Sequence, residues 1–130
     1  MGFCKTSAAA AGVLLCYYPA LLRETNMIVA IVTFHLAQPT TLAEITKTFQ
    51  STAPKYQGIA GLLRKNYWLS EDGRRAGGIY VWASRADAER LYTSEWKKMV
   101  ESRYGVSPAI EYLHSPVMVD NRDGTISVAA

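Results

Sequence analysis

The chain has very little cysteine or histidine. Its 130 residues include two cysteines, Cys4 and Cys16, and both fall within the first 26 residues. The remainder has no thiol, which excludes disulfides, cysteine nucleophiles and cysteine-bound zinc there. The only histidines are His35 and His114. Because they are far apart in sequence, we expect no metal site.

The chain also has no strong excess of charge of one sign. Fourteen basic residues against eleven acidic ones give a net charge of +3. No basic run is longer than two residues, as at Lys97-Lys98. This mild balance argues against a nucleic-acid partner and against attraction to an acidic membrane surface.

The first 26 residues differ in composition from the rest. Residues 8–22 form an apolar run, but no small-residue cleavage site follows it and it is short for a membrane span. Three interpretations stay open: an upstream start that extends a domain beginning at Met27, an inefficient export signal, and a non-native appendage. We expect no stable membrane insertion and a cytoplasmic protein, with export as the alternative.

From Met27 onward the sequence predicts alternating strands and helices. Thr41-Leu-Ala-Glu44 is a capping box that begins a helix, and Pro54 ends it. Ser84-Arg-Ala-Asp87 begins a second helix, which ends at Tyr104-Gly105. The strands are expected at residues 28–36, in a hairpin over 62–83 around Asp72-Gly73, and from 109 to about 119.

This order is βαββαβ, the α+β ferredoxin-like arrangement of a four-stranded antiparallel sheet with two helices on one face. The expected domain covers residues 27–123, with an N-terminal extension at 1–26 and a loose tail at 124–130. Both sheet faces are apolar, and the helices cover only one of them. We therefore expect a homodimer with the two sheets face to face, a dimeric α+β barrel.

The hairpin carries the candidate site. Side chains alternate along a strand, so Lys65 and Tyr67 share one face, and Tyr80 and Trp82 share one face. A loop with an even number of residues, as in an Asp-Gly two-residue turn, places these four on the same face. An odd loop places Arg64, Asn66 and Trp68 beside Tyr80 and Trp82 instead. Either patch fits a small-molecule pocket or a packed core.

The hairpin also resembles a known family. The segments Gly61-Leu62-Leu63-x-Lys65, Ser70-Glu71 and Ala76-Gly77-Gly78-Ile79-Tyr80-Val81-Trp82 are similar to the YdhR-like monooxygenase family of the dimeric α+β barrel superfamily. The resemblance extends from Met27 to about Asp123. It implies a homodimer with one cavity per protomer, and cofactor-independent oxygenation of a small aromatic or polycyclic substrate. The alternative is a non-catalytic small-molecule-binding or structural dimer of the same fold.

The candidate residues each have a structural alternative. Lys65 is expected to bind a phenolate or enolate, or else to pair with Glu71 or Glu111 or to extend its ammonium to solvent at the barrel rim. Tyr67, Tyr80 and His35 are further catalytic candidates, and the alternatives are core packing or a hydrogen-bonded structural histidine. The expected substrate-binding residues, which are otherwise core, are Trp68, Trp82, Tyr92 and Trp96. The resemblance also extends to haem-degrading relatives, which hold haem through a histidine on the second helix. No histidine lies between Ser84 and Tyr104 here, which argues against haem.

Overall fold

The computed structural model describes residues 26–129. The N-terminal segment, with both cysteines and the expected boundary near Met27, lies almost wholly outside these residues. The chain divides into two compact units. The larger is Ile28–Leu113, and the other includes His114–Ala130.

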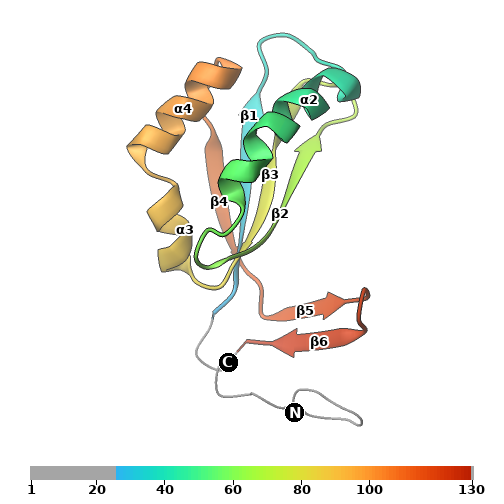
Figure 1. Cartoon of the computed structure of the whole chain (residues 1–130), viewed down its shortest axis with the longest axis vertical. Helices are drawn as coiled ribbons and strands as arrows, with labels where there is room; N and C mark the ends of the chain where they lie inside the picture. Colours follow the sequence, from blue (N-terminus) through green and yellow to red (C-terminus); the bar gives the residue numbers. More distant parts are fainter. Residues whose placement is uncertain (1–25, 130) are drawn as a thin grey trace. The chain divides into compact units, whose positions relative to one another are not determined.

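The larger unit is built on a four-stranded sheet. Its strands are β1 (Ile28–His35), β2 (Leu62–Leu69), β3 (Arg75–Trp82) and β4 (Ala109–His114). They lie in the order β2-β3-β1-β4, and β3 is antiparallel to both β1 and β2. This is the predicted α+β, ferredoxin-like fold with its four-stranded antiparallel sheet (Figure 1).

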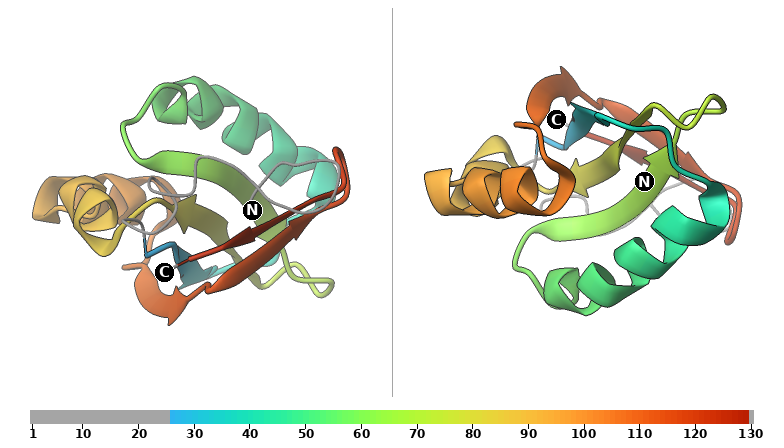
Figure 2. Two further views of the ribbon diagram at one scale, coloured as in Figure 1. Left: turned by 90° about the horizontal axis from the view of Figure 1, so that it is seen from below. Right: turned by 90° about the horizontal axis from the view of Figure 1, so that it is seen from above.

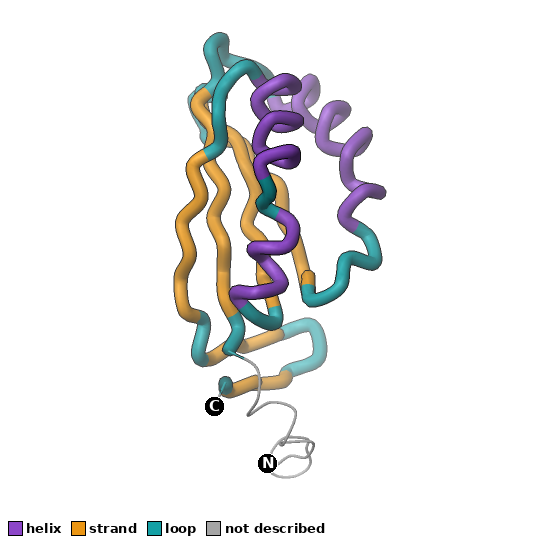
Figure 3. The backbone as a smooth tube through the Cα atoms, turned by 90° about the vertical axis from the view of Figure 1, so that its left-hand side faces the viewer, coloured by secondary structure: helices purple, strands orange, loops and turns teal. Residues whose placement is uncertain are grey.

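The helices lie on one side of this sheet (Figure 3). They are α2 (Leu42–Thr52), the short 3-10 helix η1 (Ala53–Tyr56), α3 (Arg85–Leu91) and α4 (Ser94–Tyr104). Thr41 and Glu44 form the predicted capping box at the start of α2, and Gly105, with φ of 85°, ends α4. None of the helices that the structure describes is long and apolar enough to span a membrane.

The second predicted helix is two helices rather than one. α3 ends at Leu91, and Tyr92 leaves the helical conformation with ψ of 56°. Thr93 then caps α4, because its hydroxyl accepts a hydrogen bond from the Trp96 amide at 3.1 Å. The apolar spacing runs unbroken across this break, so the cap at Thr93 was the only signal for it.

The core lies between the sheet and the helices. Alternate residues of β1 and β3 are buried there, including Ala30, Val32 and Tyr80, while their neighbours are less buried. Trp96 and Val100 of α4 complete this layer from the helix side. The first strand is therefore fully buried on the face toward the helices and only partly buried on its other face.

The β2–β3 hairpin has an even loop. The Ser70 amide donates to the Arg75 carbonyl at 2.8 Å, which leaves the four residues 71–74 as the turn in place of the predicted two. Lys65 pairs with Tyr80, and Tyr67 pairs with Gly78. Lys65, Tyr67 and Tyr80 therefore share the face that the helices cover.

None of the helices in the described part of the chain lies over the opposite face of the sheet (Figure 2). Ile31 of β1 and Ile79 of β3 are opposite each other there, and Ile79 is 40% exposed. Trp68 of β2 lies against Gly77 on this face, where a Cβ at Gly77 would approach the Trp68 ring within 3.1 Å. The indole nitrogen of Trp68 is buried without a hydrogen-bond partner among the described residues.

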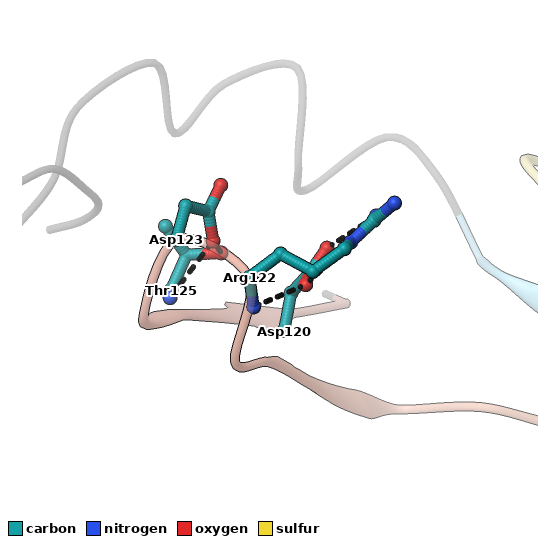
Figure 4. A network of polar contacts seen from close by, with 4 residues as sticks. All are labelled: Asp120, Arg122, Asp123 and Thr125. Atoms are coloured by element: carbon teal, nitrogen blue, oxygen red, sulfur yellow. Dashed lines mark hydrogen bonds and ion pairs between the residues drawn. The ribbon is translucent and has the colours of Figure 1, made fainter.

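The smaller unit contains a two-stranded hairpin of β5 (Val117–Asp120) and β6 (Thr125–Val128). The sequence predicted a loose tail over residues 124–130, which is wrong for Thr125–Val128. Arg122 donates to the Asp120 carboxylate, and the Thr125 amide donates to Asp123 at 3.1 Å (Figure 4). These local bonds satisfy the polar groups of the turn.

Candidate functional site

A small cavity lies between the sheet and helices α2 and α4. The sheet contributes Lys65, Tyr67 and Tyr80, with Gly77 and Gly78 beside them. The helix side contributes two polar residues, Thr52 and Arg103. Its other lining residues are apolar or aromatic: Phe49, Tyr56, Trp96, Met99, Val100 and Tyr104. The hairpin face that the even loop selects is therefore the face that lines a cavity.

Lys65 is enclosed by three tyrosine rings. Its Nζ lies 3.3 Å from the ring centroid of Tyr56, 3.8 Å from that of Tyr67 and 4.6 Å from that of Tyr80. The negative face of an aromatic ring attracts a cation at such distances. Gly78 provides the space, because a Cβ there would lie 3.2 Å from Lys65 Cε and closer still to the Tyr80 ring. We call Tyr56, Tyr67 and Tyr80 the tyrosine cage.

Lys65 has no carboxylate partner among the described residues. None of the ion pairs within 4.0 Å among residues 26–129 includes it, and no Asp or Glu lines the cavity. The pairing with Glu71 or Glu111 that the sequence left open is absent from the described structure. Burial lowers the pKa of Lys65 from 10.5 to about 7. Ammonium and neutral amine are therefore both populated near neutral pH.

The proton of the Tyr67 hydroxyl is directed away from the cavity. Thr52 donates its single hydroxyl hydrogen to the Phe49 carbonyl at 3.1 Å. The Thr52 oxygen also lies 2.8 Å from the Tyr67 hydroxyl, so Tyr67 is the donor in that bond. Burial raises the pKa of Tyr67, which keeps this proton in place. Tyr67 consequently offers only lone pairs to the cavity.

The Tyr56 hydroxyl, unlike that of Tyr67, has a hydrogen that it can donate to a ligand. Trp96 Nε1, which can only donate, gives a hydrogen bond of 3.1 Å to the Tyr56 oxygen. The Tyr80 hydroxyl also hydrogen-bonds to Tyr56, and because this bond raises the pKa of Tyr80, Tyr80 is its donor. The hydroxyl hydrogen of Tyr56 is used in neither bond and remains available to a ligand. Burial raises the pKa of Tyr80 far above its usual range, so Tyr80 stays a neutral phenol. Tyr56 is therefore the hydrogen-bond donor of the tyrosine cage.

The cavity adjoins an open groove. The groove runs along η1 and the first half of β2, and it shares Tyr56, Lys65 and Tyr67 with the cavity. Its volume of about 320 Å³ is in the range of small-molecule sites, whereas the cavity has about 20 Å³, room for about one water molecule. The Lys65 and Tyr56 side chains thus separate a ligand-sized groove from an almost filled cavity.

The structure separates the residues singled out from the sequence into three groups. Lys65, Tyr67, Tyr80 and Trp96 line the cavity. Trp82 and Tyr92 are in the core beside it, where Trp82 Nε1 donates to the Tyr92 hydroxyl at 3.1 Å.

The third group lies away from the cavity. Trp68 is on the uncovered face of the sheet. His35 is exposed at the end of β1, opposite Arg75.

Sequence reasoning missed Tyr56 and Arg103 as cavity residues. Tyr56 follows Pro54 in η1, beyond the end of α2, so helical spacing alone did not orient it. Arg103 is in the last turn of α4, where an arginine is ordinarily explained by its favourable interaction with the C-terminal end of the helix dipole. The shared register of Lys65 and Tyr80 was visible in the sequence, but the helix residues above them were not.

Replacing Lys65 tests whether its amine is buried without a charged partner. The unfolded chain holds the Lys65 proton up to about pH 10.5, whereas the folded protein releases it near pH 7. The free energy of unfolding of the wild type should therefore rise between pH 7 and 9.5, by up to about 1.4 kcal/mol per pH unit. Lys65→Met removes this rise, and urea unfolding at several pH values measures it.

The exposed Lys98 of α4 provides the control for that comparison. Lys98→Met should follow the wild-type pH dependence, because Lys98 is exposed on α4 and does not line the cavity. Equal pH dependence of Lys65→Met and the wild type would contradict the burial of an unpaired ammonium. Tyrosine ionisation changes the free energy of unfolding of all three proteins equally, so it cancels when the variants are compared with the wild type.

No protein-family model matches the chain, and no curated protein matches it by sequence. Solved structures do match. A monooxygenase from the gene ActVA-Orf6 of Streptomyces coelicolor, in complex with the ligand nanaomycin D, is 17% identical with a TM-score of 0.57 over 73% of this chain and 92% of that one.

Two further structures are similar to the same extent. A protein of Caulobacter crescentus assigned to the antibiotic biosynthesis monooxygenases is 23% identical, with a TM-score of 0.54 over 76% of this chain and 98% of that one. The protein SO0527 from Shewanella oneidensis is 20% identical, with a TM-score of 0.54 over 71% and 93%. At these identities, the likeness establishes that the chain has the α+β fold of antibiotic-biosynthesis monooxygenase structures.

Proposed function

We propose that the protein is a cofactor-independent monooxygenase that oxidises a small aromatic or polycyclic phenol at the tyrosine cage. The observation that carries the proposal is the unpaired Lys65 amine, which three tyrosine rings surround and which borders a ligand-sized groove. The fold shared with monooxygenases supports it. The finer assignment to the YdhR-like family rests on the segment from Gly61 to Trp82.

The first step is loss of a proton from the substrate. A neutral Lys65 amine, populated because its pKa is about 7, accepts the phenol or enol proton. The resulting ammonium stays within the tyrosine cage and pairs with the new oxyanion. The Tyr56 hydroxyl, which Trp96 orients, donates a hydrogen bond to the same oxygen. Lys65 and Tyr56, which the groove shares with the cavity, thus generate and hold an electron-rich anion in the groove.

The anion then supplies the electrons for dioxygen. One electron passes from the ring to dioxygen, and the two radicals combine as a peroxide at a ring carbon ortho or para to the oxyanion, which bears one hydrogen. Loss of the remaining carbon-bound proton breaks the O–O bond, leaving one oxygen in a carbonyl and the other in water. Carbon is oxidised and dioxygen is reduced, so no external reductant is needed.

Oxygen consumption tests this proposal. Chelator-treated protein should take up dioxygen with anthrones or polyphenols, and Lys65→Met should lower kcat/KM at least about a hundredfold, the usual contribution of a general base. Tyr56→Phe should lower it about tenfold, the equivalent of one lost hydrogen bond. His35→Gln, away from the cavity, should have wild-type activity. Uptake that is unchanged in Lys65→Met would contradict the mechanism.

A non-catalytic ligand-binding protein is the second candidate. The observation that favours it is the difference in size between groove and cavity, because a ligand can occupy the groove without reaching past Lys65. In that case the protein binds aromatic molecules saturably, with no oxygen uptake across the same substrate panel. The groove then has a binding role and the tyrosine cage a structural one.

We further propose that the protein forms a homodimer through the uncovered sheet face. Ile31 and Ile79 occupy its centre, and Trp68 has a buried, unbonded indole nitrogen on the same face. An antiparallel sheet that is apolar on both faces requires a cover on each. A second copy, placed face to face, supplies that cover and leaves the cavity of each protomer on the helix side.

Light scattering coupled to gel filtration tests the dimer. The wild type should have twice the mass of the chain, and Ile79→Lys should give a folded monomer, because it places a charge at the centre of the interface. Leu42→Lys is the control, since Leu42 is 70% exposed at the start of α2. A monomeric wild type, or an Ile79→Lys protein that remains dimeric, would rule out this interface.

A further inference from the structure

The groove and the cavity meet at the Lys65 side chain. Lys65, Tyr56 and Tyr67 line both spaces. The groove, with a volume of about 320 Å³, has room for a small aromatic molecule, and the cavity has room for about one water molecule. The Lys65 amine therefore has a ligand-sized space on one side and a water-sized space on the other.

This amine is available as a nucleophile as well as a base. No ion pair within 4.0 Å and no hydrogen bond among residues 26–129 includes the Lys65 Nζ. Its contacts are the three aromatic rings of the tyrosine cage, which do not occupy a lone pair. Burial lowers its pKa to about 7, so about half of the molecules hold a neutral amine at pH 7. Desolvation of this kind activates lysines that attack carbonyl groups.

We propose that the groove binds an aromatic aldehyde, which Lys65 captures covalently as an imine. The aromatic ring lies in the groove against Leu62, Leu63 and Tyr67, which line it. The Lys65 nitrogen bonds to the aldehyde carbon, and the Tyr56 hydroxyl donates a hydrogen bond to the aldehyde oxygen. The nitrogen then loses both of its hydrogens, and the oxygen leaves with them as one water molecule. The step needs no oxidant or reductant.

Two features of the site favour this product. The imine nitrogen, when protonated, has the same positive charge as the ammonium and keeps its contact with the tyrosine cage. The released water has a place in the adjoining cavity, where Thr52, Tyr67 and Arg103 supply the polar partners that a buried water needs. The small volume of the cavity thus suits the leaving molecule, while the ring stays in the groove.

This activity goes beyond the proposed oxygenation and is independent of it. Oxygenation uses the Lys65 amine to accept a proton, whereas imine formation makes a carbon–nitrogen bond and consumes no dioxygen. An aromatic aldehyde without a hydroxyl group is able to form the imine but has no phenol proton to lose. Such an aldehyde therefore separates the two activities.

The probe is 2-naphthaldehyde, and the exposed Lys98 of the same molecule is the internal reference. After borohydride reduction at pH 7, peptide mass spectrometry should find Lys65 half modified at an aldehyde concentration at least about a hundredfold lower than Lys98 requires, because an ordinary lysine is almost wholly charged. Raising the pH to 9 should lower that concentration about a hundredfold at Lys98 but only about twofold at Lys65. Both ratios are measured within the wild type and depend on no variant.

A variant and a second aldehyde provide the controls. Lys65→Arg keeps the positive charge without a nucleophilic amine, so it should abolish labelling in the groove and leave labelling of Lys98 unchanged, with circular dichroism as the check on folding. Butanal, which has no ring, should prefer Lys65 over Lys98 at least about tenfold less than naphthaldehyde does, because it lacks the aromatic contacts of the groove.

Each outcome bears on one claim. Equal half-modification concentrations at Lys65 and Lys98 would overturn the covalent site, and an equal preference with butanal would overturn the groove as the binding place of the ring. Oxygen uptake without imine formation would reject this inference alone. Imine formation without oxygen uptake would reject only the oxygenation.

Discussion

The candidate site depends on one interaction, the contact of the Lys65 ammonium with three tyrosine rings in place of a carboxylate. A buried cation without a counterion is costly, and burial accordingly lowers the Lys65 pKa to about 7. The rings at 3.3, 3.8 and 4.6 Å recover part of that cost for the charged form. This balance holds a basic amine near its point of titration inside an apolar cavity, where it is able to exchange a proton with a ligand.

The surrounding fold serves this arrangement. The even β2–β3 loop places Lys65 opposite Tyr80, and Gly78 leaves space for both side chains. Thr52 of α2 fixes the Tyr67 proton, and Trp96 of α4 fixes the Tyr56 oxygen. The helices thereby set the hydrogen-bond polarity of the cavity, and β2 supplies the Lys65 amine.

Much of the fold was accessible from the sequence, because its signals are local. The capping box at Thr41 and Glu44, the stop at Gly105 and the turn signal at Asp72-Gly73 each specify an element by themselves. The break at Tyr92–Thr93 was missed because apolar spacing continues across it. Only the part of the site on the two strands was accessible from the sequence. The two strands specified their own common face, but the approach of Tyr56 and Arg103 depends on tertiary packing, which no local pattern encodes.

The central claim is that Lys65 is a nearly neutral amine that receives a proton from an aromatic ligand. Heteronuclear NMR of the Lys65 Cε and Nζ, followed as a function of pH with and without a phenol that does not react with dioxygen, tests it directly. The account predicts a midpoint near pH 7 in the free protein and a higher midpoint with the phenol bound, because the phenolate stabilises the ammonium. A midpoint near 10.5 that the phenol leaves unchanged would contradict it.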